Sequence, residues 1–161
     1  MKLLPELVPE TAWCKNLRSA LSESDWDRVR KSAYKKAGYK CEICGGNGKH
    51  HPVECHEVWE YQNSSGKRGI QRLKKVEAVC PACHEVKHIG LAQVRGRYNQ
   101  AIRHMCRVNG ISKKKAEAVV VSAMAEWQKR SQIEWDCDLT EIAGSLYNDG
   151  DRGKKRPVHG G

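Results

Sequence analysis

Two pairs of cysteines, each with two residues between its members, are the residues of this chain best suited to chemistry. The pairs are Cys41/Cys44 and Cys80/Cys83. The CxxC spacing lets a tight turn direct both sulfurs at one ion, and two such pairs from separate segments supply the four soft ligands of a tetrahedral Zn²⁺ site. Because a site closed by four thiolates is structural, the pairs predict a zinc ion that stabilises the fold.

Three histidines lie between and just after the cysteine pairs. His56 belongs to residues 52–61, a run with the alternation of a β-strand. The second pair opens a predicted helix at Pro81, and His84 and His88 lie four residues apart in it. Both imidazoles are then on one face about a turn apart, a spacing at which they can bind one ion.

The predicted strand also contains two candidates for an additional metal ligand. Period-two alternation puts Glu54 on the face of His56, and Cys55 on the other face with Trp59. Glu54 is then the natural ligand. If the strand is twisted or bulged, Cys55 can reach the ion instead, and the sequence leaves both alternatives open.

This order of elements, a cysteine turn, a hairpin and a helix that begins with the second CxxC, resembles that of the HNH, or ββα-metal, endonucleases. The resemblance covers residues 38–92, and the segment from Cys80 to His84, with the further His88, is its most specific part. The HxxxH spacing is similar to that of the metal-binding helix of the colicin-type nucleases. The implied fold is α+β, with a small zinc-stabilised treble-clef core.

The resemblance implies a metal-dependent DNA endonuclease that leaves 5′-phosphate and 3′-hydroxyl ends. Cleavage would be nicking, or double-strand cleavage if two copies act together. His56 is the expected general base, because a neutral imidazole can accept a proton near pH 7. The expected ligands of a catalytic divalent ion such as Mg²⁺, Mn²⁺ or Ni²⁺ are His84, His88 and either Glu54 or Cys55.

Two positions depart from the HNH pattern. Cys55 stands where an Asp or His usually precedes the strand histidine, and Lys75 stands where the family has its middle Asn. These replacements favour an alternative function, a non-catalytic zinc module that binds nucleic acid or a protein partner and has a degenerate HNH site.

The charge of the chain favours a polyanionic partner. There are 29 Lys and Arg residues against 19 Asp and Glu, a formal net charge of +10, and such an excess attracts nucleic acid through long-range electrostatics and counterion release. The predicted return strand of the hairpin is densely basic. Its expected contacts to a DNA backbone, most naturally that of a duplex, are Lys67, Arg68, Arg72, Lys74 and Lys75.

The flanking segments are predicted to be mainly helical. Residues 1–37 form an N-terminal segment whose helix covers about residues 25–37 and is capped by Ser24. The C-terminal extension covers residues 93–147. An apolar stripe that starts just before it, at Leu91, and ends at Asn109-Gly110 predicts one helix, and Ser112 caps a second, so that the two form a helical hairpin. A short strand follows at 133–139, with Cys137 as a small core residue, and 148–161 is predicted to be a disordered tail.

The N-terminal residues do not predict a secretory signal, because Pro5 and Pro9 interrupt a short apolar stretch. No apolar run approaches the length needed to cross a bilayer, so no membrane partner is expected. A cytoplasmic location and free cysteines outside the zinc site fit this composition.

Overall fold

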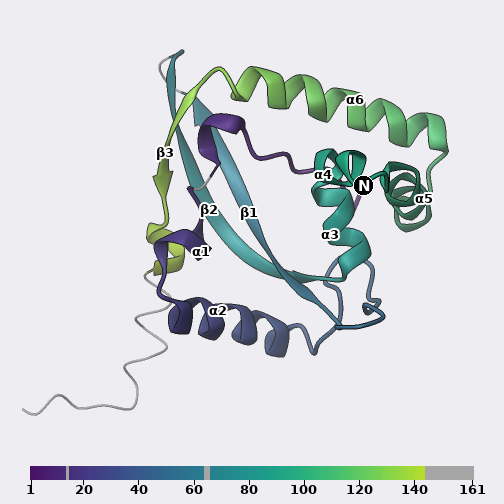
Figure 1. Cartoon of the computed structure of the whole chain (residues 1–161), viewed down its shortest axis with the longest axis horizontal. Coiled ribbons are helices and arrows are strands. Elements are labelled where there is room, and N and C mark those ends of the chain that lie inside the picture. The colour runs from purple at the N-terminus through teal and green to yellow at the C-terminus, as the bar shows by residue number, and fades with distance from the viewer. Residues whose placement is uncertain (14, 64–65, 144–161) are drawn as a thin grey trace, which may run out of the picture.

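Two long antiparallel strands form the centre of the molecule (Figure 1). Strand β1 is Glu54–Asn63 and strand β2 is Arg68–Val79, paired from Glu54 opposite Val79 to Asn63 opposite Gly69. A bulge between Val58 and Trp59 shifts the register. The structure is a computed structural model that describes residues 1–13, 15–63 and 66–143, so part of the hairpin tip and the predicted tail at 148–161 lie outside the described residues.

A third, short strand completes the sheet. Strand β3, Glu134–Asp138, confirms the strand predicted at 133–139 and runs parallel to β2 with Arg68 opposite Glu134. Trp135 is 2% exposed and packs against Gly69, where an added Cβ would lie 2.5 Å from the indole ring. The prediction for Cys137 was wrong, because its strand is at the edge of the sheet and the side chain is exposed.

Three helical segments precede the sheet: a 3₁₀ turn, η1, at Glu10–Ala12, then α1 at Leu17–Ala20 and α2 at Glu23–Lys36. The N-cap of α2 is Ser22, whose hydroxyl accepts a hydrogen bond from the backbone N–H of Asp25, and not Ser24 as predicted. Together with α1, α2 covers one side of the hairpin through a small core of Leu17, Val29 and Leu73.

Four helices follow β2: α3 at Pro81–Lys87, α4 at Ile89–Val94, α5 at Tyr98–Asn109 and α6 at Lys113–Arg130. They form a larger core that includes Val86, Ile102 and Met105. The structure confirms the cap at Ser112 and the end of the preceding helix at Asn109-Gly110, where Gly110 is a left-handed C-cap. The apolar stripe from Leu91 is broken into two helices, since the chain turns at Gly96 with φ 69° and leaves Val94 83% exposed.

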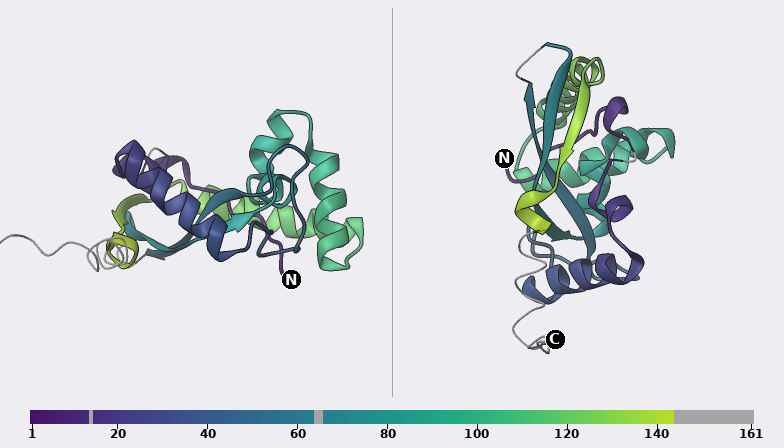
Figure 2. Two further views of the ribbon diagram at one scale, coloured as in Figure 1. Left: turned by 90° about the horizontal axis from the view of Figure 1, so that it is seen from below. Right: turned by 90° about the vertical axis from the view of Figure 1, so that its left-hand side faces the viewer.

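The first nine residues cross from these helices toward the sheet. The backbone N–H groups of Lys2 and Leu3 donate to the Asn109 side chain, and that of Glu6 donates to the Lys87 carbonyl. Figure 2 shows from two further sides that α2 and the group α3 to α6 lie on different sides of the hairpin. The described part of the chain has no helix that combines the length and apolar character needed to cross a membrane.

Candidate metal sites and cleft

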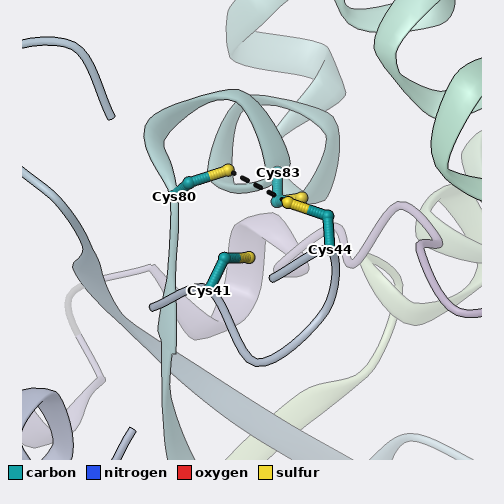
Figure 3. A group of neighbouring side chains, drawn as sticks. All are labelled: Cys41, Cys44, Cys80 and Cys83. Carbon is teal, nitrogen blue, oxygen red and sulfur yellow. Dashed lines mark hydrogen bonds between the residues drawn. The ribbon is translucent and has the colours of Figure 1, made fainter. Parts of the chain in front are cut away.

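The four cysteines of the two CxxC pairs form one cluster (Figure 3). Cys41 and Cys44 lie in the turn between α2 and β1, and Cys80 and Cys83 lie where β2 passes into α3. All four sulfur atoms lie within 4.8 Å of one another, and those of Cys44 and Cys80 are 3.7 Å apart. A tetrahedral zinc with Zn–S bonds of about 2.3 Å separates its sulfurs by about 3.8 Å, so the donor set fits a structural zinc ion.

The turn at the first pair directs its thiols into the cluster. Gly45, with φ 75°, donates its N–H to the Cys41 carbonyl, and the Cys41 N–H donates to the Gly46 carbonyl. The Gly46 N–H also points at the Cys44 sulfur, 3.4 Å away. Positive φ is available to glycine without steric cost, so the glycines after the first CxxC allow a turn whose backbone donates to a thiolate.

The charges in the cluster favour a bound cation. A hydrogen bond from Cys83 lowers the pKa of the Cys41 thiol to about 4. Burial raises the pKa of Cys80 to about 11, and the hydrogen bond to Cys41 together with burial raises that of Cys83. Of Cys41, Cys80 and Cys83, the protein alone thus favours ionisation of Cys41 only. A bound divalent ion would compensate the electrostatic repulsion between neighbouring thiolates and would allow all four thiols to ionise.

His104 is a contact of the cysteine cluster that the sequence did not predict. Its Nε2 lies 3.2 Å from the sulfur of Cys83, and its Nδ1 accepts a hydrogen bond of 2.9 Å from Arg107. Because arginine can only donate, Nε2 must carry the proton of the neutral ring and donate it to Cys83. Such a donor stabilises a metal-bound thiolate. The cysteine spacing gave no signal for a residue in α5, 21 positions away.

The three histidines form a second cluster. His56 comes from β1, His84 from α3 and His88 from the residue that ends α3, and one nitrogen of each lies within 4.8 Å of the others. The ring centroids are 4.8 to 5.3 Å apart and the rings meet edge to face. The structure therefore brings together the predicted base and the two predicted histidine ligands.

Glu54 fixes the orientation of His84. Its carboxylate lies 2.5 Å from Nδ1 of His84 and 2.7 Å from Nε2 of His51. If Nδ1 of His84 donates its proton to this carboxylate, the lone pair of Nε2 is available for a metal ion. Histidines that bind metals commonly have such a carboxylate partner on the other ring nitrogen. Of the two alternatives from the sequence, Glu54 is the residue that contacts the histidine cluster, as a partner of His84.

Glu6 orients His56 in the same way, through a contact that no sequence pattern predicts. The Glu6 carboxylate lies 2.7 Å from Nε2 of His56, which is only 3% exposed, and also accepts a hydrogen bond from Lys87. Lys87 is itself buried and lies 3.4 Å from Glu77. With Nε2 donating to Glu6, Nδ1 of His56 is the nitrogen with a free lone pair.

Burial keeps the helix histidines neutral at pH 7. It lowers the pKa of His84, and it lowers that of His88 to about 4, an effect increased by the neighbouring imidazoles. Neutral imidazole is the form that binds a metal ion. At neutral pH, protons therefore do not compete for these two ligands.

Cys55, the other alternative, is partly buried between α2 and a cleft that the three histidines also line. It borders a cavity with Trp26, Arg30 and Tyr34, and burial raises the pKa of its thiol to about 12. Among the described residues, the atoms that lie within 4.8 Å of one another at this site are nitrogens of the three histidines, and the Cys55 sulfur is not part of that group.

We expect Cys55 to react with iodoacetamide at pH 8 at least ~100-fold more slowly in the folded protein than in urea, because the thiolate is the nucleophile and partial burial raises the pKa of this thiol to about 12. Mass spectrometry of the labelled peptides measures this, with the exposed Cys137 as the control that reacts in the folded protein. Equal rates at Cys55 and Cys137 would contradict the burial of Cys55 against α2.

A cleft of about 400 Å³ opens at the histidine cluster. All three histidines line it, from β1 and α3, and the N-terminal segment supplies a second wall. Lys15 and Arg18 are the cations of the lining. The aromatic members of the lining are Trp13, Trp26 and Trp59.

Acidic residues neutralise much of the basic strand that was predicted to contact DNA. Arg68 pairs with Asp136 at 2.8 Å, Arg72 with Asp138 at 2.9 Å and Lys74 with Glu141 at 2.7 Å. Lys75 pairs with Glu77 at 2.9 Å. These pairs reduce the positive potential of β2, so the cleft is the stronger candidate for a phosphate contact. The contacts of Lys67, Arg68, Arg72, Lys74 and Lys75 with DNA stay predictions.

Comparison of the chain with models of protein families, with curated proteins and with solved structures finds no match. The two side-chain clusters and the cleft are therefore the basis for assigning a function.

Proposed function

We propose that the chain is a metal-dependent DNA endonuclease of the HNH type, with the cysteine cluster as the structural zinc site of a treble clef. The observation that carries this proposal is the convergence of His56, on a hairpin strand, with His84, on the helix that begins at the second CxxC, and with His88, the residue that ends this helix. Carboxylates orient two of these imidazoles. A module that only binds nucleic acid needs neither the three imidazoles nor their carboxylate partners.

In this proposal His84 and His88 would hold a divalent ion, and Glu54 orients His84. The ion would supply positive charge where negative charge grows on the phosphate during hydrolysis. His56 accepts a proton at Nδ1 from the attacking water, while Glu6 holds its Nε2 proton and stabilises the imidazolium that forms. The water oxygen bonds to phosphorus, the bond to the 3′ oxygen breaks, and the departing oxygen takes up a proton from solvent water, so the products carry 5′-phosphate and 3′-hydroxyl ends.

The proposal predicts that the purified protein nicks supercoiled plasmid DNA with Mg²⁺, Mn²⁺ or Ni²⁺ and not with EDTA. Zinc content measured before and after EDTA separates loss of a catalytic ion from loss of the structural ion, because four thiolates hold zinc tightly. Activity that returns on adding a divalent ion, at unchanged zinc content, is the expected result. Absence of nicking with each of these metals would favour the non-catalytic binding module.

A further inference from the structure

We infer that the cleft takes an unpaired nucleotide, so that the DNA this protein cuts is single-stranded or locally opened at the scissile phosphate. This inference rests on the proposed function. It makes unpaired DNA the preferred substrate, in place of the fully paired duplex expected from the charge pattern. It follows from the size, the charge and the aromatic lining of the cleft at the histidine cluster.

The size of the cleft suits one nucleotide. Its volume of about 400 Å³ is in the range of sites that enclose one small organic molecule. A base pair within a duplex is held in the stack, and an element that reads it must enter a groove from outside. The histidines line the concave wall of the cleft, so the phosphate nearest to them belongs to a nucleotide that lies inside it.

The charged side chains of the cleft are suited to a phosphate. Lys15 and Arg18 line it, and both are exposed. The Lys15 ammonium donates one hydrogen bond, of 2.9 Å, to the Trp135 carbonyl, and an ammonium has two further N–H donors. Its one carboxylate, that of Glu57, is directed away from a ligand because it accepts the backbone N–H groups of Leu17 and Arg18 at 3.3 and 3.4 Å. The cleft therefore presents cations next to the histidine cluster while its acid is occupied by the protein backbone.

The aromatic side chains of the cleft are suited to a base. Trp13 is 60% exposed, yet its indole N–H donates to the Val8 carbonyl at 3.0 Å, so the ring is anchored at one edge. Trp26 and Trp59 line the same cleft and are partly buried against the core beneath α2. An exposed indole face can stack only on a base that has left its own stack, and such stacking is tolerant of sequence.

The test uses one labelled DNA strand presented in three forms: alone, in a duplex with a short unpaired bubble, and in a fully paired duplex. With the unchanged protein and Mn²⁺, we expect the single strand and the bubble to be cut at least ~10-fold faster than the paired duplex, in line with the contribution of one stacked base. This comparison needs no variant and so does not depend on how a substitution folds.

Trp13→Ala is expected to lower single-strand cleavage about 10-fold, whereas Trp13→Phe keeps a stacking face and most of the rate. The matched control is Val121→Ala, an exposed apolar position on α6 that does not line the cleft, with unchanged cleavage expected. Equal cutting of paired and unpaired forms, or full single-strand activity in Trp13→Ala, would overturn the inference and leave the nuclease standing. Absence of cutting of all three forms would overturn both.

Discussion

Replacing Cys83 by serine is expected to unfold the region that holds both clusters. A structural zinc ion contributes on the order of 10 kcal/mol to the folding of small modules, as much as the whole stability of a typical domain. Cys83 is fully buried, and its segment supplies the start of α3, which carries His84. Loss of the ion would therefore release the helix on which the second cluster depends.

Circular dichroism and zinc content of the Cys83→Ser protein measure this effect. The matched control is Cys137→Ser, because Cys137 is exposed and lies outside the cysteine cluster. We expect one tightly held zinc and a cooperative thermal transition in the control, and neither in Cys83→Ser. A folded Cys83→Ser protein without zinc would show that packing around Val86 and Met105 maintains the fold by itself, contrary to the assigned role of the ion.

Replacing His56 by alanine is expected to lower DNA cleavage by roughly 10²- to 10⁴-fold, the usual contribution of a general base. The fold and the affinity of the proposed divalent-ion site should be retained, because His84 lies in α3 and is oriented by Glu54, and His88 ends the same helix. His50→Ala is the matched control, since His50 is an exposed histidine of the loop before β1.

Metal binding by the same variant decides which role His56 has. Its donor nitrogen lies within 4.8 Å of those of His84 and His88, a separation that suits either a base beside the ion or a third ligand. Titration with Co²⁺, followed by absorption, separates the two. Retained Co²⁺ affinity with lost cleavage supports the base, and loss of both makes His56 a ligand. Unfolding of His56→Ala would instead assign the residue to the scaffold.

Local sequence patterns predicted the parts of the site that are set by spacing. Both CxxC pairs, the strand with His56 and the helix with His84 and His88 are where the patterns placed them, because each depends on residues a few positions apart. Local patterns failed where a competing local contact decided the outcome. Ser22, and not Ser24, caps α2 because its hydroxyl reaches the Asp25 N–H.

The contacts that complete the site could not be predicted, because they join distant segments. Glu6 lies 50 positions from His56, and His104 lies 21 positions from Cys83. The ion pairs of β2 with Asp136 and Asp138 span 68 and 66 positions and exist only because β3 pairs with β2. The net charge of +10 does not indicate which Lys and Arg side chains are neutralised by such ion pairs.

The contact of Glu6 with Lys87 has a consequence for the order in which the protein folds. The two residues are 81 positions apart, and Leu3 is held by Asn109 at a separation of 106. Closing such loops costs chain entropy before any contact compensates it, so long-range contacts tend to form late. The two cysteine pairs and the hairpin between them, by contrast, lie within residues 41–83 and need only shorter loops to be closed. The segment of residues 1–9, although it is synthesised before the cysteine turn, is therefore expected to dock after it and to bring Glu6 to His56 late, so that the proposed base gains its carboxylate partner only once its scaffold has folded.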